Sequence, residues 1–143
     1  MRFTKQSEYV RPSAIGIILN DQGQILLVQR NVEPFIDMWM MPGGHMKPGE
    51  TIEECLRREV KEETGLEAEI GELFTVHSDP EQDPRHASLV LFYFAKVKSN
   101  EFEKNKVFEI ADRRWFNLSD VPKEMAFHHR RIFDKFTREY LKK

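Results

Sequence analysis

The sequence has one cysteine, Cys55, and no long hydrophobic run. One thiol cannot form a disulfide within the chain or a cysteine-based zinc site, so we expect Cys55 to be a small buried residue. No segment approaches the roughly 20 apolar residues that cross a bilayer, and the first residues do not resemble a signal peptide. We therefore expect no membrane association and a cytoplasmic location.

The sequence also has little net charge. Charged residues make up 32% of the chain, but the formal net charge is only −2. No overall field favours nucleic acid or a membrane surface, so an anionic ligand needs a local site. The sequence contains no internal repeat, low-complexity tract or linker, which predicts a single domain over residues 1–143.

Strand-like runs outnumber helical patterns. The runs are residues 14–19, 24–29, 39–41, 73–77, 89–97 and 114–116. Helical periodicity fits residues 52–64 and roughly 127–141, and the turn at residues 20–23 predicts that the first two runs form a hairpin. The order predicts an α/β or α+β architecture, a mixed sheet with helices packed on its faces.

The helix predicted over residues 52–64 has clear end signals. Thr51 followed by Glu54 fits a capping box, and Gly65 stands where a left-handed C-terminal cap is expected.

Three glutamates in this helix share its apolar side. With Ile52, an apolar residue, at zero and about 100° per residue, Glu59 falls near −20°, Glu63 near +20° and Glu62 near −80°. The alternative is that they belong to an ordinary solvated face. Their angular position favours an inward orientation, which needs a physical reason.

Buried like charges require a cation. Two carboxylates about 4 Å apart repel by about 4 kcal/mol at an effective dielectric constant of 20. Arg57, Arg58 and Lys61 fall on the outward arc of the helix, so a hard divalent cation bound through oxygen ligands fits better. Magnesium is the expected ion, because it accepts a few carboxylates and keeps sites for water and phosphate oxygens. The preceding loop contains Gly43 and Gly44, which allow close backbone approach to a ligand.

The same residues form a known motif. Gly44, then Glu50 after five residues, then R-E-V-K-E-E-T-G-L at residues 58–66 after seven more, resemble the Nudix box, G-x5-E-x7-R-E-U-x-E-E-x-G-U with U aliphatic. Residues 29–30, 39–44 and 114–116 are also similar to those of Nudix domains.

The resemblance implies a fold, a reaction and a set of site residues. Nudix domains are α/β/α sandwiches, and most hydrolyse a nucleoside diphosphate linked to another group with Mg²⁺ or Mn²⁺. By resemblance, the catalytic and metal-binding residues are Glu59, Glu62 and Glu63, with the Gly44 carbonyl as a further metal ligand, and with Arg58 holding the acidic cluster by pairing with Glu50 or a neighbour.

The proton acceptor is less defined. It is one of the helix glutamates or an acid of residues 101–112, where many family members carry a loop carboxylate. We select Glu109 because it shortly precedes the strand predicted at residues 114–116. The alternative is that Glu109 is a solvated loop residue.

A second segment bears on the substrate. Residues 78–86, S-D-P-E-Q-D-P-R-H, resemble the S-x-P-x-x-D-P-R-G-H segment of one group of ADP-ribose pyrophosphatases. The glycine before His86 is missing, and His128 stands where that group usually has aspartate. Arg85 could clamp a phosphate or stack on a base, or lie at the solvated edge of a turn. Gly43, Gly44 and Arg30 are the other expected substrate contacts.

Three functions remain open from the sequence. The first is hydrolysis of ADP-ribose or a related nucleoside diphosphate sugar. The second is removal of pyrophosphate from oxidised or noncanonical nucleoside triphosphates, and the third is a sensor module that binds a nucleotide without turnover. The expected partner is a small-molecule nucleotide, not nucleic acid, and the resemblance is also compatible with a homodimer.

Overall fold

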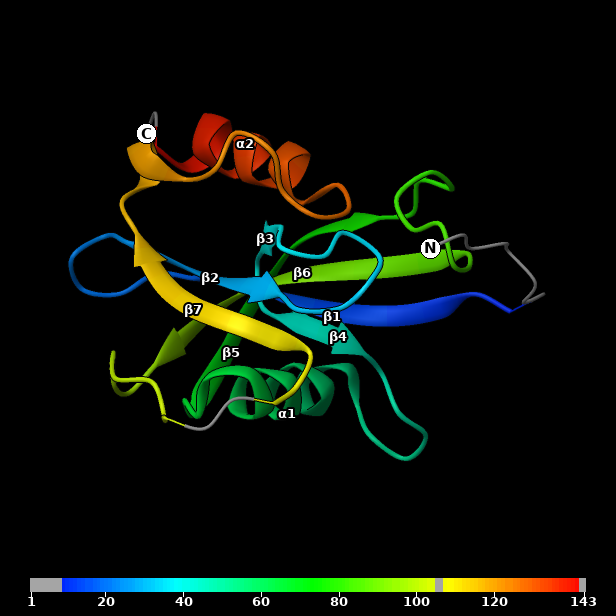
Figure 1. Ribbon diagram of the computed structural model, residues 1–143, viewed down its shortest axis with the longest axis horizontal. Coiled ribbons are helices and arrows are strands. Elements are labelled where there is room, and N and C mark those ends of the chain that lie inside the picture. The colour runs from blue at the N-terminus through cyan, green and yellow to red at the C-terminus, as the bar shows by residue number, and fades with distance from the viewer. Residues whose placement is uncertain (1–8, 105–106, 142–143) are drawn as a thin grey trace.

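The computed structural model describes residues 9–104 and 107–141. Two β-sheets lie between two long helices, α1 and α2 (Figure 1). The elements are β1 (Arg11–Ile18), β2 (Ile25–Arg30), β3 (Trp39–Met40), β4 (Gly43–His45), α1 (Ile52–Thr64), β5 (Ala68–His77), β6 (Ser88–Val97), β7 (Ile110–Phe116), the short 3-10 helix η1 (Leu118–Asp120) and α2 (His129–Tyr140). The α+β architecture expected from the sequence is confirmed, with the strands divided between two sheets.

The larger sheet has the strand order β4-β1-β6-β5, and the smaller one has the order β3-β2-β7. Strand β1 pairs antiparallel with β4 and parallel with β6, and every other pair is antiparallel. Because β1 lies between β4 and β6, it brings the loop before β6 next to the end of β4.

The predicted hairpin of β1 and β2 is wrong. The turn at residues 20–23 forms, with the Gly23 N–H donating to the Asn20 carbonyl at 3.0 Å, but only one bridge, Leu19 to Ile25, follows it. Strand β1 then pairs within the larger sheet and β2 within the smaller one. A turn signal is local, whereas distant strands compete for the hydrogen-bonding edges of β1 and β2.

The core has two main layers. Alternate residues of β1 face opposite ways: Ile15 and Ile17 pack with the apolar stripe of α2, and Ala14 and Ile18 pack with that of α1. Strand β1 is therefore buried on both faces, which explains its continuous apolar run. Figure 1 shows α1 and α2 on opposite sides of the sheets. In the described part of the chain, no helix is long and apolar enough to cross a membrane.

Helix α1 begins and ends where its sequence signals predict. The Thr51 side chain accepts from the Glu54 N–H, and the Glu54 carboxylate accepts from the Thr51 N–H, which completes the capping box. Gly65 is left-handed at φ 80°, and its N–H donates to the Lys61 carbonyl. Both ends are fixed, so the register of the three glutamates on the helix is fixed too.

Candidate functional site

The loop and strand before α1 contact the end of that helix. Glu63 is 6% exposed, and its Oε1 accepts from the Gly43 N–H at 3.1 Å. The Cys55 thiol, which is buried as expected, lies 3.4 Å from the Gly44 carbonyl oxygen. A Cβ at Gly44 would lie 2.5 Å from Glu59 Oε2. Gly44 therefore permits a close approach between β4 and the acidic side of α1.

Arg58 organises the acidic residues. Its guanidinium donates to both oxygens of Glu50, at 2.8 and 3.0 Å, to Glu59 at 2.6 Å and to Glu62 at 3.2 Å. The Arg58 hydrogen bonds, followed by the Lys47 N–H, lower the pKa of Glu50 to about 2. The ion pair with Glu50 that the family resemblance implies is present.

The helical projection was wrong about Arg58. It placed the residue on the outward arc, but the side chain is only 22% exposed and also donates to the His45 carbonyl at 2.9 Å. A long arginine side chain can leave the angular position of its Cα and lie along the helix surface. The nearest basic group therefore partly neutralises the cluster, which the projection did not predict.

Glu63 is the most deeply buried of the three glutamates. Burial, followed by the charge of Glu59, raises the pKa of Glu63 well above its usual value, although the hydrogen bond from Gly43 opposes this shift. Glu59 is 17% exposed and Glu62 is 40% exposed at the side chain. The inward position expected from periodicity thus holds for Glu63 and Glu59, while Glu62 lies nearer to solvent.

The donor set fits a divalent cation. Three hard oxygen donors lie close together: the buried Glu63 carboxylate, the Glu59 carboxylate beside it and the Gly44 carbonyl. Mg²⁺ and Mn²⁺ prefer donors of this kind, and a cation would stabilise the charged form of Glu63, which burial disfavours. In the described residues, Glu59, Glu62 and Glu63 do not form a group of three whose ligand atoms all lie within 4.8 Å of one another. Arg58 lies between Glu59 and Glu62, so coordination by all three would require their side chains to rearrange.

A cavity of about 300 Å³ opens beside these groups. Of the site residues expected from the sequence, the cavity is lined by Gly43, Gly44, Glu59, Glu63, Arg30, Arg85 and Glu109, but not by Arg58 or Glu62. Glu109 is exposed, and its carbonyl accepts from the Asn31 N–H at 2.8 Å. The fold therefore brings Glu59 and Glu63 of α1 and the expected basic contacts, Arg30 and Arg85, into one space.

The basic part of the cavity contains an aromatic ring. The guanidinium carbons of Arg30 and Arg85 lie 5.0 and 5.7 Å from the centre of the Phe127 ring. Arg30 is buried and donates to the Pro34 carbonyl at 2.6 Å. Burial, followed by the charge of Arg85, lowers the pKa of Arg30 to about 10, so it remains a cation at neutral pH. Two fixed cations suit an anionic ligand.

Residues 78–86 close one side of the cavity. Asp83 is 4% exposed and accepts two hydrogen bonds from the Arg85 guanidinium, at 2.9 and 3.1 Å, and one from the Arg85 N–H at 2.9 Å. These bonds lower the pKa of Asp83 despite its burial. Arg85 is thus held by a buried carboxylate, and it is not at the solvated edge of a turn.

Several cavity residues were not predicted as site residues. His45, Gln82, Asp83 and His129 all line it. His45 directly follows Gly44 in the sequence, and this position next to the motif could have identified it as a site residue. Asp83 and His129 come from distant segments, so only the tertiary structure brings them together.

His129, at the start of α2, should make the free energy of unfolding depend on pH. Its Nδ1 accepts from the Met41 N–H at 3.0 Å, and burial lowers its pKa to about 3. The unfolded ring has a pKa of about 6.5. As the pH falls from about 6.5 towards 3, the unfolded chain binds a proton that the folded chain does not. His129 alone should therefore lower the free energy of unfolding by up to about 1.4 kcal/mol per pH unit, while the raised pKa of Glu63 acts in the opposite direction.

Urea unfolding at several pH values measures this slope. Burial also lowers the pKa of His45, to about 4, and it contributes in the same direction. The His129→Gln variant should lose stability at neutral pH and show a shallower decline towards acid. An unchanged slope in that variant would rule out His129 as a source.

Known proteins resemble this chain over most of its length. The NUDIX domain family model matches residues 10–136. An ADP-ribose pyrophosphatase of Methanocaldococcus jannaschii is 34% identical over 131 residues, which is 91% of this chain and 76% of that protein. A putative 8-oxo-dGTP diphosphatase of Bacillus subtilis is 32% identical over 124 residues, covering 86% and 77%. Some other relatives are longer, and the chain spans 32% or 38% of their length.

A solved structure shows a similar fold. The NUDIX domain of Shewanella oneidensis NrtR, in complex with ADP ribose, superposes with a TM-score of 0.79 at 25% sequence identity. The superposition covers 94% of this chain and 90% of that one. Fold, acidic helix and cavity together define the class of metal-dependent pyrophosphohydrolases. The chain belongs to the Nudix family, whose hydrolases use divalent metal ions.

Proposed function

We propose that this protein hydrolyses the pyrophosphate bond of ADP-ribose or a related nucleoside diphosphate sugar, releasing a nucleoside monophosphate and a sugar phosphate. The observation that carries the proposal is the position of Arg85. Residues 78–86 bring it into the cavity that Glu59 and Glu63 also line. A diphosphate ester needs both ends of such a site, metal-binding carboxylates for the phosphates and a planar cation for the attached group.

The proposed mechanism assigns a role to each group. Bound divalent ions, which we propose to be Mg²⁺ with Mn²⁺ as the alternative, would neutralise the pyrophosphate oxygens and acidify a water molecule. Glu59, Glu62 and Glu63 would hold them together with the Gly44 carbonyl, while Arg58 keeps the carboxylates oriented. Glu109, on the cavity wall, is our candidate proton acceptor.

Two similarities support this substrate class. The Methanocaldococcus jannaschii relative is an ADP-ribose pyrophosphatase, and the similar NUDIX domain of NrtR was solved with ADP ribose. Arg30, Arg85 and Phe127 could contact the ribose phosphate or the base. We also retain a cytoplasmic location and a homodimer as proposals, each of which needs its own measurement.

The second candidate is a nucleoside triphosphate or diphosphate substrate with an oxidised base. It is favoured by the Bacillus subtilis relative and by the human 8-oxo-dGDP phosphatase NUDT18, which is 31% identical over 131 residues. The non-catalytic sensor is the third candidate, but retention of the acidic residues and Arg58 favours turnover.

Product analysis separates these candidates. The purified protein is incubated with ADP-ribose, 8-oxo-dGTP and 8-oxo-dGDP at several Mg²⁺ concentrations, and the products are identified by chromatography. The proposal expects AMP and ribose 5-phosphate from ADP-ribose as the most efficient reaction. Inorganic pyrophosphate from the triphosphate, or inorganic phosphate from the diphosphate, at a higher kcat/KM would favour the second candidate. Binding without any product would favour the sensor.

Arg85→Gln should weaken substrate binding. Losing a charge-assisted contact of about 1.5–3 kcal/mol should raise KM for ADP-ribose about tenfold to a hundredfold, with a smaller change in kcat. Arg114→Gln is the matched control, because Arg114 is 59% exposed and does not line the cavity. Steady-state kinetics of both variants measure the effect. If Arg85→Gln and Arg114→Gln had the same KM for ADP-ribose, Arg85 would not be part of the substrate-binding site.

A further inference from the structure

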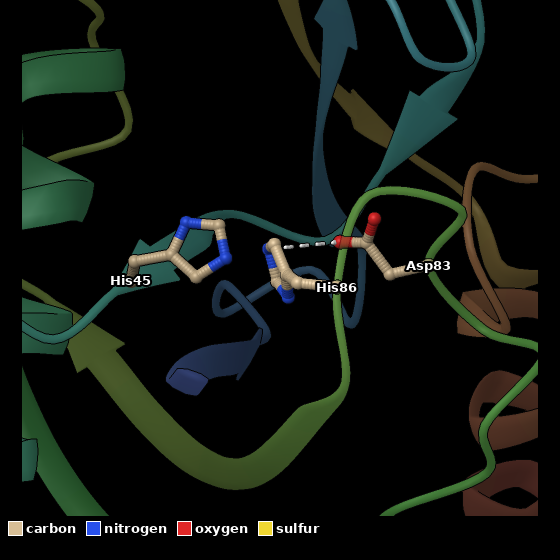
Figure 2. Close-up of side chains that lie close together, drawn as sticks. All are labelled: His45, Asp83 and His86. Atoms are coloured by element: carbon tan, nitrogen blue, oxygen red, sulfur yellow. Dashed lines mark ion pairs between the residues drawn. The ribbon is translucent and has the colours of Figure 1, made fainter. Parts of the chain in front are cut away.

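A second group of possible metal ligands lies away from the glutamates of α1. Figure 2 shows His45, Asp83 and His86 close together. One ligand atom from each lies within 4.8 Å of the other two. His86 Nε2 is 3.5 Å from Asp83 Oδ2, and the two imidazole rings are 4.9 Å apart between centroids.

The sheet topology creates this group. In β1, Ser13 pairs with His45 of β4 on one side and with Val90 of β6 on the other. The loop that ends at β6 therefore lies beside the end of β4. His45 is in β4, and Asp83 and His86 are in the loop that leads into β6. Strand pairing through β1 therefore sets the spacing of the three residues.

His86 is the unusual member of the group. Its Nδ1 lies 3.0 Å from the Ala87 carbonyl oxygen, which can only accept, so Nδ1 must carry the proton of that hydrogen bond. In a neutral imidazole the other nitrogen is then a bare acceptor. Among the described residues, no group forms a hydrogen bond with the buried His86 Nε2, and the Asp83 carboxylate, 3.5 Å away, is also an acceptor.

An unsatisfied buried acceptor facing a carboxylate is costly, typically about 1–3 kcal/mol. A cation between the two nitrogens and the carboxylate would satisfy all three groups. Histidine ligands of metals commonly donate their other ring N–H to a backbone carbonyl, and His86 has this arrangement. Asp83 and His86 are 4% and 6% exposed, so these two ligands are sheltered from water.

We propose that His45, Asp83 and His86 bind a divalent transition-metal ion of the zinc type, separate from the ions of the glutamate site. Two imidazoles and one carboxylate are ligands that Zn²⁺ and Co²⁺ favour and that Mg²⁺ does not. Arg85 neutralises much of the Asp83 charge, which further disfavours a hard ion. His45 and Asp83 line the cavity, so a fourth coordination position is open to water or an anionic ligand.

The ion would have a positioning role. Asp83 holds Arg85 through three hydrogen bonds, and a metal bond to the same carboxylate would tie Arg85 to β4 through His45. The positive charges of Arg11 and Arg85 lie close enough to lower the pKa of His45. The same charges repel a bound cation, so they limit the metal affinity of the site. The proposal does not depend on which nucleotide is the substrate.

Cobalt titration tests the proposal. The full chain is saturated with Mg²⁺ to occupy the glutamates, and Co²⁺ binding is followed by its visible absorption and by calorimetry. A second group, His77, Asp79 and His128, also has ligand atoms within 4.8 Å of one another, so the His77→Asn/His128→Asn double variant serves as background. In this double variant, one equivalent of Co²⁺ should bind to His45, Asp83 and His86. The bound ion should show the strong absorption of a tetrahedral site, and Zn²⁺ should displace it.

Adding His45→Asn to this background should weaken Co²⁺ binding by at least about tenfold, since even the loss of a partner that only orients a metal ligand costs about tenfold to a hundredfold. His45 is partly exposed, so this substitution should leave the fold intact, which circular dichroism checks. His86→Asn is the second variant and should have the same effect. Co²⁺ binding that is unchanged by both variants would overturn the proposal. So would the absence of binding, as expected if a protonated His86 simply pairs with Asp83.

Discussion

Replacing Glu63 with glutamine is expected to lower kcat by about two to four orders of magnitude while the protein stays folded. The amide keeps the size of the side chain and an oxygen that can accept the Gly43 N–H, now at 3.1 Å from Glu63 Oε1. It loses the charge that a divalent ion requires. Steady-state kinetics at saturating Mg²⁺ measure the effect on turnover.

The same variant should not lose stability, although its kcat falls. Burial and the charge of Glu59 raise the pKa of Glu63, so the charged form is unfavourable in the metal-free protein. Glu63→Gln should therefore keep or raise the melting temperature without metal. Glu53→Gln, an exposed substitution on the same helix, should change neither property. A Glu63→Gln enzyme with near wild-type turnover would exclude the catalytic role.

Gly43→Ala is expected to destabilise the fold by more than about 3 kcal/mol. Gly43 has φ 147°, a conformation that L-residues rarely adopt, and an added Cβ would collide with the Ala14 carbonyl oxygen and lie 2.8 Å from the Ile15 Cα. Both are backbone atoms of the adjacent strand β1, so no side-chain rotation relieves the clash. Urea unfolding of the metal-free protein measures the loss.

Gly49→Ala is the matched control. Gly49 is also left-handed, at φ 87°, but no atom of the described residues lies within 4 Å of a Cβ there. It should cost only the conformational penalty, about 1–2 kcal/mol. If Gly43→Ala were no more destabilising than Gly49→Ala, the close contact between β4 and β1 would not be what requires glycine at residue 43.

Helix α1 was predictable from the sequence because its signals are local. Thr51, Glu54 and Gly65 set both ends, and the apolar periodicity sets the inward face that Glu63 and Glu59 share. Position on a helix does not fix where a long side chain ends, so the contacts of Arg58 and the exposure of Glu62 required the structure.

The sheets were less predictable because strand pairing is not local. Strand β4 is a Gly-Gly-His segment without an apolar pattern, and residues 68–72 of β5 are mostly half-buried or exposed, so neither was expected as a strand. The predicted start of α2 at Phe127 was two residues early, since Phe127 is left-handed at φ 56°.

The cavity shows the same limit. The sequence marks residues 78–86 as unusual, but it does not show that Asp83 holds Arg85 inside the cavity. The parallel pairing of β1 with β6 is what places this loop opposite Gly44 and His45. Long-range placement of this kind depends on the whole sheet.

Exhaustive chelation tests most directly whether hydrolysis depends on bound divalent ions. The enzyme is dialysed against a chelator until metal analysis detects no divalent ion, and turnover is measured before and after Mg²⁺ is added back. If Glu59, Glu62 and Glu63 bind the ions that activate the pyrophosphate, activity should disappear and return with Mg²⁺, while the fold persists throughout. Full activity in the metal-free enzyme would contradict this mechanism.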